Sequence, residues 1–314
     1  MFLMQQERLR DSTLKGSGRL IAGLVVSALM APLLSACDAP SLRDGPLSFL
    51  ARAGNQDAAS DLYRRVTQGD ESALVELMKL SAEKRDAYAA FYAGLSFDPG
   101  VQTRGVKPDA AKSARLYDSA RRLPAAKHNL ALLLLSGVSP VSRDPSAQFP
   151  EPVQLLGESA QSRIESMLLL AVLFERGFGQ IKPNPALSAQ WYAKAIEHSK
   201  DRRAQMRLGV AYLEGRGVAQ DASKGYELLL SAAKAGSSEA QYRLALLDQP
   251  AIQAAQWFSV AAITDAAYSA AAYAALSKVS ATDQERIKRR ATLWVHAHQV
   301  QRPLPAFSEP IKAP

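Results

Sequence analysis

The chain has 314 residues, of which 47% are hydrophobic and 22% charged, with a formal net charge of +8 and a single cysteine. Apart from the run Lys288-Arg289-Arg290, the basic residues are scattered. None of them is interleaved with aromatic residues, as the groove of a nucleic-acid-binding protein would require, so the composition argues against nucleic acid as a partner. One thiol allows no disulfide within the chain, and the fold must therefore be stabilised by packing.

The N-terminus has the layout of an export signal. Basic residues at positions 8, 10, 15 and 19 precede an apolar run from Leu20 to Leu34, and small residues then lead to Cys37. As a helix, the run of 15 residues would reach about 22 Å, short of the roughly 30 Å of a bilayer core, which argues against a transmembrane span. A buried free cysteine would not explain the ordered segment before it.

This layout resembles the signal of bacterial lipoproteins. The resemblance implies cleavage before Cys37 and acylation of that residue, so that residues 1–36 are a signal peptide and residues 37–45 a lipidated tether. It also implies a location in the cell envelope of a Gram-negative bacterium, anchored to a membrane and facing the periplasm. In enterobacterial lipoproteins of this kind an aspartate after the cysteine opposes transfer to the outer membrane, so Asp38 favours the inner membrane.

Residues 46–108 predict helices that begin a helical array irregularly. The segments 54–58 and 69–73 each have a glycine followed four residues later by alanine, and they echo the later segment 236–240. Since 236–240 joins two repeats further along the chain, we expect this N-terminal part to be an irregular start of the same stack.

Two motifs recur between residues 109 and 262. In the first, a small residue is followed four positions later by leucine and then by a second small residue, as in Ala204, Leu208 and Gly209. The same triplet recurs 36 residues later, and earlier copies start at residues 166 and 126. Small residues and leucine at these spacings mark one helix face that packs closely against a neighbour. Each triplet therefore predicts the first helix of a repeat.

The second motif is a bulky pair with a small residue three positions after its second member. It occurs at Leu116-Tyr117, Leu155-Leu156, Trp191-Tyr192, Leu228-Leu229 and Trp257-Phe258. A large side chain of one repeat can fill the space left by a small one in the next, so these positions predict the second helix. The alternative for Trp191, Tyr192 and Trp257 is a strip that stacks on sugars, but their regular repeat position favours core packing.

Turn residues lie where the two helices of a repeat must be joined. The glycines that would supply left-handed residues after a first helix are Gly177, Gly179, Gly215 and Gly217. Asp109, Asn184 and Asp221 each stand seven residues before a bulky pair, where their side chains would cap the second helix.

The run 204–236 resembles a Sel1-like repeat, a relative of the tetratricopeptide repeat, and residues 166–199 resemble a second copy. Partial copies lie at 109–121 and 240–262, and a degenerate copy at 126–160. The resemblance implies an all-α fold, a right-handed α-solenoid of stacked helix-turn-helix repeats that extends over residues 109–262.

The end of the chain predicts a closing segment and a tail. Residues 263–300 favour capping helices, because Arg286, Arg289 and Arg290 alternate with apolar residues in an amphipathic pattern with a polar outer face. Residues 301–314 predict a proline-rich tail.

The sequence contains no recognisable catalytic or metal-binding constellation. His296 and His298 are two apart and point away from each other on a helix, while His128 and His198 are isolated, as surface histidines are. No serine stands in a Gly-x-Ser-x-Gly elbow, and the glycine pairs lie between helices and do not follow a strand. We therefore expect no enzyme activity, cofactor or metal.

The predicted function follows from shape and location. A stack of helix pairs offers an extended surface for other proteins, and the resemblance to Sel1-like and tetratricopeptide lipoproteins implies an adaptor for envelope proteins in polysaccharide export or secretion assembly. The alternative is a lipoprotein that binds peptidoglycan or another glycan, with an enzyme third. A row of exposed aromatic side chains would favour glycan, and a mixed polar and aliphatic face would favour protein. The charged positions chosen for partner contact are Arg207, Glu214, Lys234 and Arg243.

Overall fold

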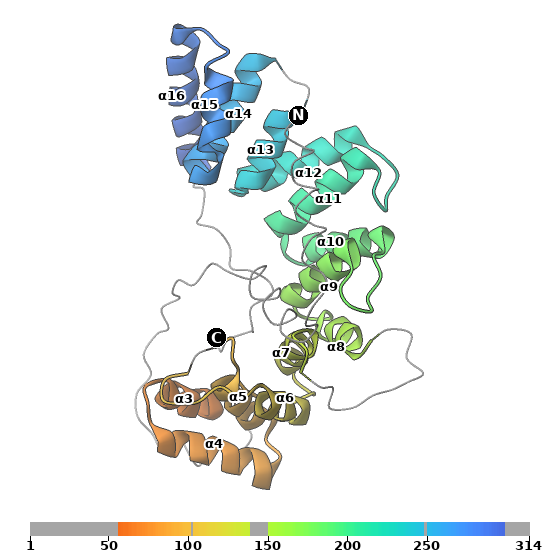
Figure 1. The fold of residues 1–314 in the computed structure, drawn as a ribbon, viewed down its shortest axis with the longest axis vertical. Coiled ribbons are helices and arrows are strands. Elements are labelled where there is room, and N and C mark those ends of the chain that lie inside the picture. The colour runs from red at the N-terminus through yellow and green to blue at the C-terminus, as the bar shows by residue number, and fades with distance from the viewer. Residues whose placement is uncertain (1–55, 102, 139–149, 248–249, 299–314) are drawn as a thin grey trace, which may run out of the picture. The chain divides into compact units, whose positions relative to one another are not determined.

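The computed structural model describes residues 56–101, 103–138, 150–247 and 250–298 (Figure 1). Within these residues the chain is helical, apart from turns and an isolated antiparallel bridge between Phe178 and Ile181. The described residues divide into two compact units, the first up to residue 138 and the second from residue 150. Both units are built from packed helix pairs of the α-solenoid type, as the sequence predicts.

The first unit is arranged around one fully apolar helix. Its helices are α3 (Gln56–Thr67), α4 (Glu71–Lys84), α5 (Ala87–Phe97), α6 (Ala110–Ser119) and α7 (Pro124–Leu135). Each helix packs against the next, and α3 also packs against α5. Nearly all of α5 is buried, because its sequence is apolar on every face.

Aromatic and polar side chains share the core of this unit. Tyr63 stacks on Tyr92 with their ring centroids 5.5 Å apart. Tyr117 donates a hydrogen bond of 2.7 Å to the carboxylate of Asp98, and the amide of Asn129 donates to the Tyr117 hydroxyl at 3.2 Å. Burial raises the pKa of Asp98, although the hydrogen bond from Tyr117 opposes this shift. The core of the first unit is thus held by a buried polar cluster as well as by apolar contacts.

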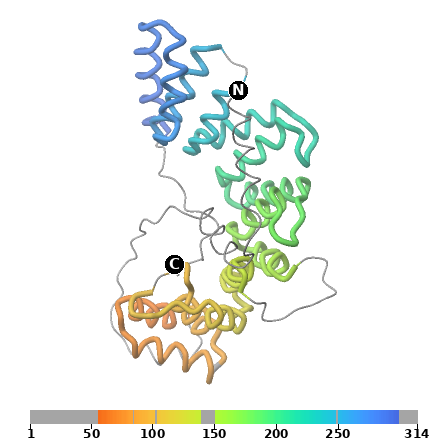
Figure 2. Tube along the Cα trace, in the orientation of Figure 1, coloured from red at the N-terminus to blue at the C-terminus, as the bar shows by residue number. Residues whose placement is uncertain are grey.

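The second unit is a succession of helix hairpins followed by closing helices (Figure 2). It contains α8 (Glu151–Ser159), α9 (Ile164–Arg176), α10 (Pro185–Ser199), α11 (Arg202–Glu214), α12 (Ala222–Lys234), α13 (Ser238–Leu246), α14 (Ala251–Thr264), α15 (Ser269–Leu276) and α16 (Ala281–Ala297). The pairs α9 and α10, α11 and α12, and α13 and α14 pack as hairpins, and α10 with α11 and α12 with α13 connect one hairpin to the next.

The small residues of the second motif and the leucines of the first are buried. The small residues after the bulky pairs each expose 0% of their surface, and these are Ala120, Ser159, Ala195, Ala232 and Ala261. The leucines of the first motif expose at most 5%, and these are Leu130, Leu170, Leu208 and Leu244. Where the small position of α8 and that of α9 are both serine, the hydroxyls of Ser159 and Ser166 hydrogen-bond to each other at 2.8 Å. The repeat therefore tolerates a buried hydroxyl when a second one lies opposite.

The two helices of a repeat are tied by the same backbone hydrogen bond in three hairpins. In each, the N–H of the residue that caps the second helix donates to the carbonyl of an aromatic residue at or near the end of the first. The pairs are Asp109 with Phe97 at 2.8 Å, Asn184 with Phe174 at 2.6 Å, and Asp221 with Tyr212 at 2.9 Å. The side chains of the three capping residues also accept a hydrogen bond from the first turn of their helices, so the predicted N-caps are confirmed.

The predicted turn glycines are confirmed. They have positive φ angles of 72° at Gly177, 55° at Gly179, 68° at Gly215 and 73° at Gly217. At Gly217 a Cβ would lie 2.2 Å from the carbonyl carbon and oxygen of Pro185. Only glycine lets the loop after α11 lie this close to the backbone at the start of α10.

His128 corrects the expectation that the isolated histidines lie at the surface. It is completely buried in α7. The sequence of α7 is apolar on most of its faces, so the helix has almost no outward side on which the imidazole could lie.

Candidate functional site

Two of the four charged positions predicted for partner contact lie together. Arg207 and Arg243 stand one residue before the buried leucine of α11 and of α13, which places them at equivalent positions in successive first helices. Glu214 ends α11, and Lys234 ends α12. Because the helices of a hairpin run in opposite directions, the C-terminal ends of α11 and α12 are far apart, and these two residues do not form one site with each other.

A row of alternating charges joins the first helices of three hairpins. Glu175 of α9 lies 3.5 Å from Arg207 of α11, which lies 4.0 Å from Glu239 of α13, and Glu239 is 3.1 Å from Arg243. We name these four residues the charged row. Their side chains expose between 18% and 36% of their surface, so the row is open to solvent along its length.

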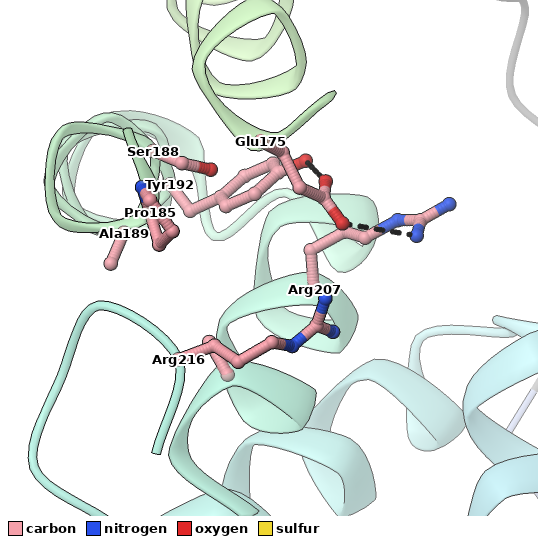
Figure 3. Close-up of a pocket in the computed structure, with 8 residues that line it drawn as sticks. Glu175, Pro185, Ser188, Ala189, Tyr192, Arg207 and Arg216 are labelled. Atoms are coloured by element: carbon pink, nitrogen blue, oxygen red, sulfur yellow. Dashed lines mark hydrogen bonds and ion pairs between the residues drawn. The ribbon is translucent and has the colours of Figure 1, made fainter. Parts of the chain in front are cut away.

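The first member of the row is fixed from the neighbouring helix. Tyr192 of α10 donates a hydrogen bond of 2.7 Å to Glu175, while the other carboxylate oxygen of Glu175 is directed to Arg207 (Figure 3). Burial of the Tyr192 ring, followed by the nearby charge of Glu175, raises the pKa of Tyr192 well above its usual value. The hydroxyl therefore remains a proton donor, and Glu175 keeps its position.

A shallow pocket adjoins this end of the row. Glu175, Tyr192, Arg207 and Arg216 contribute to its lining together with the start of α10 at Pro185 (Figure 3). Arg216 follows α11 and pairs with Glu214 at 2.5 Å, which places the predicted Glu214 beside the pocket but outside the charged row. The pocket thus combines charged and polar groups with the apolar side chains of Pro185, Ala189 and Ala211.

Aromatic side chains lie at the other end of the row. Tyr242 of α13 stacks on Tyr268 with their ring centroids 4.9 Å apart, and its ring meets the ring of Phe258 edge-on at 5.5 Å. Tyr242 is three residues after Glu239 on α13, and residues at this spacing are neighbours on a helix, which places the aromatic cluster beside the charged row. Burial raises the pKa of Tyr268, and the charge of Glu239 adds to this shift. Arginine and tyrosine side chains together are typical of surfaces at which proteins meet.

The aromatic residues of the second helices do not form an exposed strip. Tyr192 is buried, whereas Trp191 is half-buried with the Lys194 ammonium 4.3 Å from its ring centroid. Trp257 packs against the buried core of the neighbouring hairpin and meets Trp294 edge-on at 5.3 Å. Core packing is therefore only partial for the two tryptophans, both of which are half-buried. The mixed polar face of the charged row favours a protein partner over a glycan.

The described part of the chain offers no metal site, since no three His, Cys, Asp or Glu side chains in it are grouped so as to hold an ion. In the same part of the chain no helix is both long and apolar enough to cross a bilayer. Cys37, Asp38 and the apolar segment before them lie outside the described residues.

Sequence reasoning missed both glutamates of the charged row. The pair Glu239 and Arg243 has the i, i+4 spacing of helical ion pairs, and this signal could have found it. Glu175 and Arg207 are 32 residues apart and come together only through the packing of α9, α10 and α11.

The Sel1 repeat model matches residues 87–123, 124–147, 164–199 and 202–237. The chain contains four Sel1 repeats. The first includes α5 and α6 and starts before Asp109, where the sequence motifs become clear. The last two are the hairpins α9 to α10 and α11 to α12, which supply Glu175, Tyr192 and Arg207 to the site.

Two solved structures are similar to the chain, and the first agrees with this result. A Sel1 repeat protein from Oxalobacter formigenes is 26% identical, with a TM-score of 0.55, over 67% of this chain and 85% of that one. The protein c5321, a protective antigen of uropathogenic Escherichia coli with an SLR fold, is 18% identical over 82% of this chain, with a TM-score of 0.45. The match to c5321 spans 66% of the length of that protein. None of the curated proteins matches the chain. Sel1 repeat proteins generally serve as scaffolds for protein–protein interaction.

Proposed function

We propose that this Sel1 repeat protein is a lipid-anchored adaptor of the bacterial cell envelope, without enzyme activity, which holds a partner protein on the charged row. The observation that carries the proposal is the state of Arg207. Its two ion-pair contacts, at 3.5 Å and 4.0 Å, are too long to be strong hydrogen bonds. The planar guanidinium therefore keeps N–H donors for carboxylates or carbonyls of a partner.

The alternating signs of the row give the surface specificity. A partner segment that crosses α9, α11 and α13 meets negative, positive, negative and positive charge in turn, and only one register matches this order. The aromatic cluster at Tyr242 and Tyr268 adds an apolar contact at one end.

The location in the envelope is supported by the N-terminal sequence. Lipidation at Cys37 would hold the repeats at a membrane, with Asp38 favouring the inner membrane, and would place them among the proteins of polysaccharide export or secretion. Fatty-acid labelling tests this part of the proposal. The variant Cys37→Ser should lose the label and remain at precursor size, and a variant that still matures and still carries lipid would contradict the anchor.

The binding surface is tested by cross-linking in cells of the source bacterium. We expect the double variant Arg207→Gln with Arg243→Gln to lose most of a cross-linked envelope protein that the wild type captures. Arg207→Lys should also weaken the capture, because it keeps the charge but removes the planar donors.

The matched control is Lys182→Gln with Lys278→Gln, which removes two exposed charges elsewhere on the second unit. It should leave capture unchanged. All of these variants should melt within a few degrees of the wild type, since substitutions at the surface change stability by less than about 0.5 kcal/mol. Equal capture by wild type and by the Arg207/Arg243 variant would contradict the binding surface. Hydrolysis of a cell-wall substrate, abolished by one side-chain change, would contradict the adaptor role.

A further inference from the structure

The last helix of the second unit has a basic outer face. On its inner side α16 packs against α14 through Ile287 and Ala291, which are buried, and through Trp294, which meets Trp257 of α14. At 100° per residue, an exposed stripe that runs from beside Trp294 to the opposite side of the helix carries Arg286, Arg289, Arg290, Leu293, His296 and Ala297. We name these six residues the basic stripe.

The stripe carries charge of one sign. Asp283 is paired with Arg286 at 2.6 Å and Glu285 with Lys288 at 2.8 Å, so the two acidic residues of α16 lie at the margin of the stripe. Arg286 nevertheless keeps 51% of its side chain exposed. Within the described residues, Arg289 and Arg290 have no carboxylate at ion-pair distance. The guanidinium groups of these two arginines are therefore available to an anionic partner.

An exposed leucine lies among these arginines. Leu293 exposes 59% of its surface although it belongs to a helix whose other large apolar residues are at least partly covered. The sequence predicts a wholly polar outer face for this closing helix, and Leu293 is the departure from that expectation. At a lipid surface the apolar side chain of Leu293 can enter the boundary of the acyl chains while the arginines beside it remain among the phosphates.

We infer that the basic stripe of α16 binds the surface of a membrane that contains anionic lipids. The helix has 17 residues and is therefore about 25 Å long, so its arginines can contact several headgroups at once. Each guanidinium can donate two parallel hydrogen bonds to a lipid phosphate. Leu293 adds an apolar contact that an acidic protein surface would not need. This contact is separate from the charged row and does not depend on the proposed partner binding.

The test places an environment-sensitive fluorescent probe on the stripe of the full chain. The variant Cys37→Ser with Ala297→Cys has a single thiol, at which the probe is attached, and it keeps Leu293 and all the arginines. Vesicles with 30% phosphatidylglycerol should raise the fluorescence and shift it to the blue, whereas pure phosphatidylcholine vesicles should not. Raising the salt from 50 to 300 mM should reverse most of the change, because exposed charges are screened. The control is a probe attached through Ser231→Cys, on the exposed side of α12. It should show no such change, even if another segment of the chain binds the vesicle.

Variants of the stripe give the strength of the contact. Each arginine near an anionic surface contributes about a fivefold factor in partition, so Arg286→Gln, Arg289→Gln and Arg290→Gln together should weaken the probe response roughly 100-fold in lipid concentration. Leu293→Gln should weaken it at every salt concentration. The control Arg176→Gln, Lys182→Gln and Lys194→Gln removes the same charge from other exposed positions and should change little. The inference is overturned if both vesicle types act alike, if the triple arginine variant responds as the wild type does, or if polyglutamate produces the response and vesicles do not.

Discussion

The hairpins α5 to α6 and α11 to α12 have the same contacts at the loop that joins their helices, but different side chains pack between the helices. In both, the backbone N–H of the capping aspartate donates to an aromatic residue at or near the end of the first helix, and a lysine in the first turn of the second helix covers that ring. The ammonium of Lys112 is 3.8 Å from the ring centroid of Phe97, and that of Lys224 is 4.3 Å from the centroid of Tyr212. The two hairpins therefore share three features: the loop, the aspartate that caps the second helix, and a lysine ammonium over an aromatic ring. We call these features the frame of the repeat.

The space between the helices distinguishes the two hairpins. In the first, Gly94 makes room for the ring of Tyr117, because a Cβ at position 94 would lie 2.7 Å from that ring. In the second, Gly209 brings the helix backbones together, and its Cβ would lie 3.0 Å from the carbonyl oxygen of Gly225. A tyrosine in the core brings a hydroxyl that must be paired, which Asp98 does, whereas contact through glycines needs no partner. The same frame is thus compatible with either polar or apolar packing between the two helices.

The largest expected effect comes from breaking the loop. Gly217→Val should lower the free energy of unfolding by about 4 kcal/mol, because valine has both an unfavourable positive φ and a clash with the backbone of Pro185. The matched variant is Gly105→Val in the loop of the first hairpin, where φ is 75° but no atom lies within 4 Å of a Cβ. It should cost about 2 kcal/mol, from strain alone. Thermal and urea melts measure both, and equal losses would show that the close approach to α10 does not matter.

The next effect comes from the buried hydrogen bond between Tyr117 and Asp98. Tyr117→Phe should cost about 2 kcal/mol, because it leaves the buried carboxylate of Asp98 without its hydroxyl donor. Tyr192→Phe is the control, since Glu175 is half-exposed and retains its contact with Arg207. Its cost should be no more than about 1 kcal/mol. Urea unfolding compares the two, and a larger loss for Tyr192→Phe would contradict the special role of the buried cluster.

The smallest effect is on the pH dependence of stability. Burial raises the pKa of Asp98 in the folded chain above its ordinary value of 3.8, so the unfolded chain loses this proton first as the pH rises. The contribution of Asp98 is therefore complete below pH 3.8 and declines as the pH rises towards the folded-state pKa. Asp98→Asn should remove this decline. Urea unfolding at a series of pH values from 3 to 7 measures it as the difference between wild type and variant.

Asp70 gives the opposite sign and serves as the comparison. Hydrogen bonds from Ser72 and Arg65 lower its pKa from 3.8 to about 2, so its contribution is present above pH 3.8 and is lost as the pH falls towards 2. The wild type should therefore lose stability as the pH falls from 3.8 towards 2, and Asp70→Asn should remove this loss. The same sign of change for both variants would contradict the assignment of Asp98 as a carboxyl whose pKa is raised by burial.

Repeat spacing and turn chemistry made the frame predictable from the sequence. The small residues, the leucines, the capping residues and the turn glycines were identified by position, because each has a local physical reason that recurs at every copy. The candidate site was predictable only in part. Arg207 and Arg243 were found from their place between packing residues, whereas Lys234 and Glu214 have the same pattern but lie outside the row.

The sequence by itself determined that this chain is a stack of helix hairpins with Sel1-like repeats, because period, caps and glycines are local properties. Only the tertiary structure decided which side chains are buried between the helices and which side chains of different hairpins meet at the surface. It buried His128, left Trp191 half-exposed, and joined Glu175 to Arg207. These outcomes depend on which helix packs on which, and at what distance, and that information is shared between segments that are far apart in the chain.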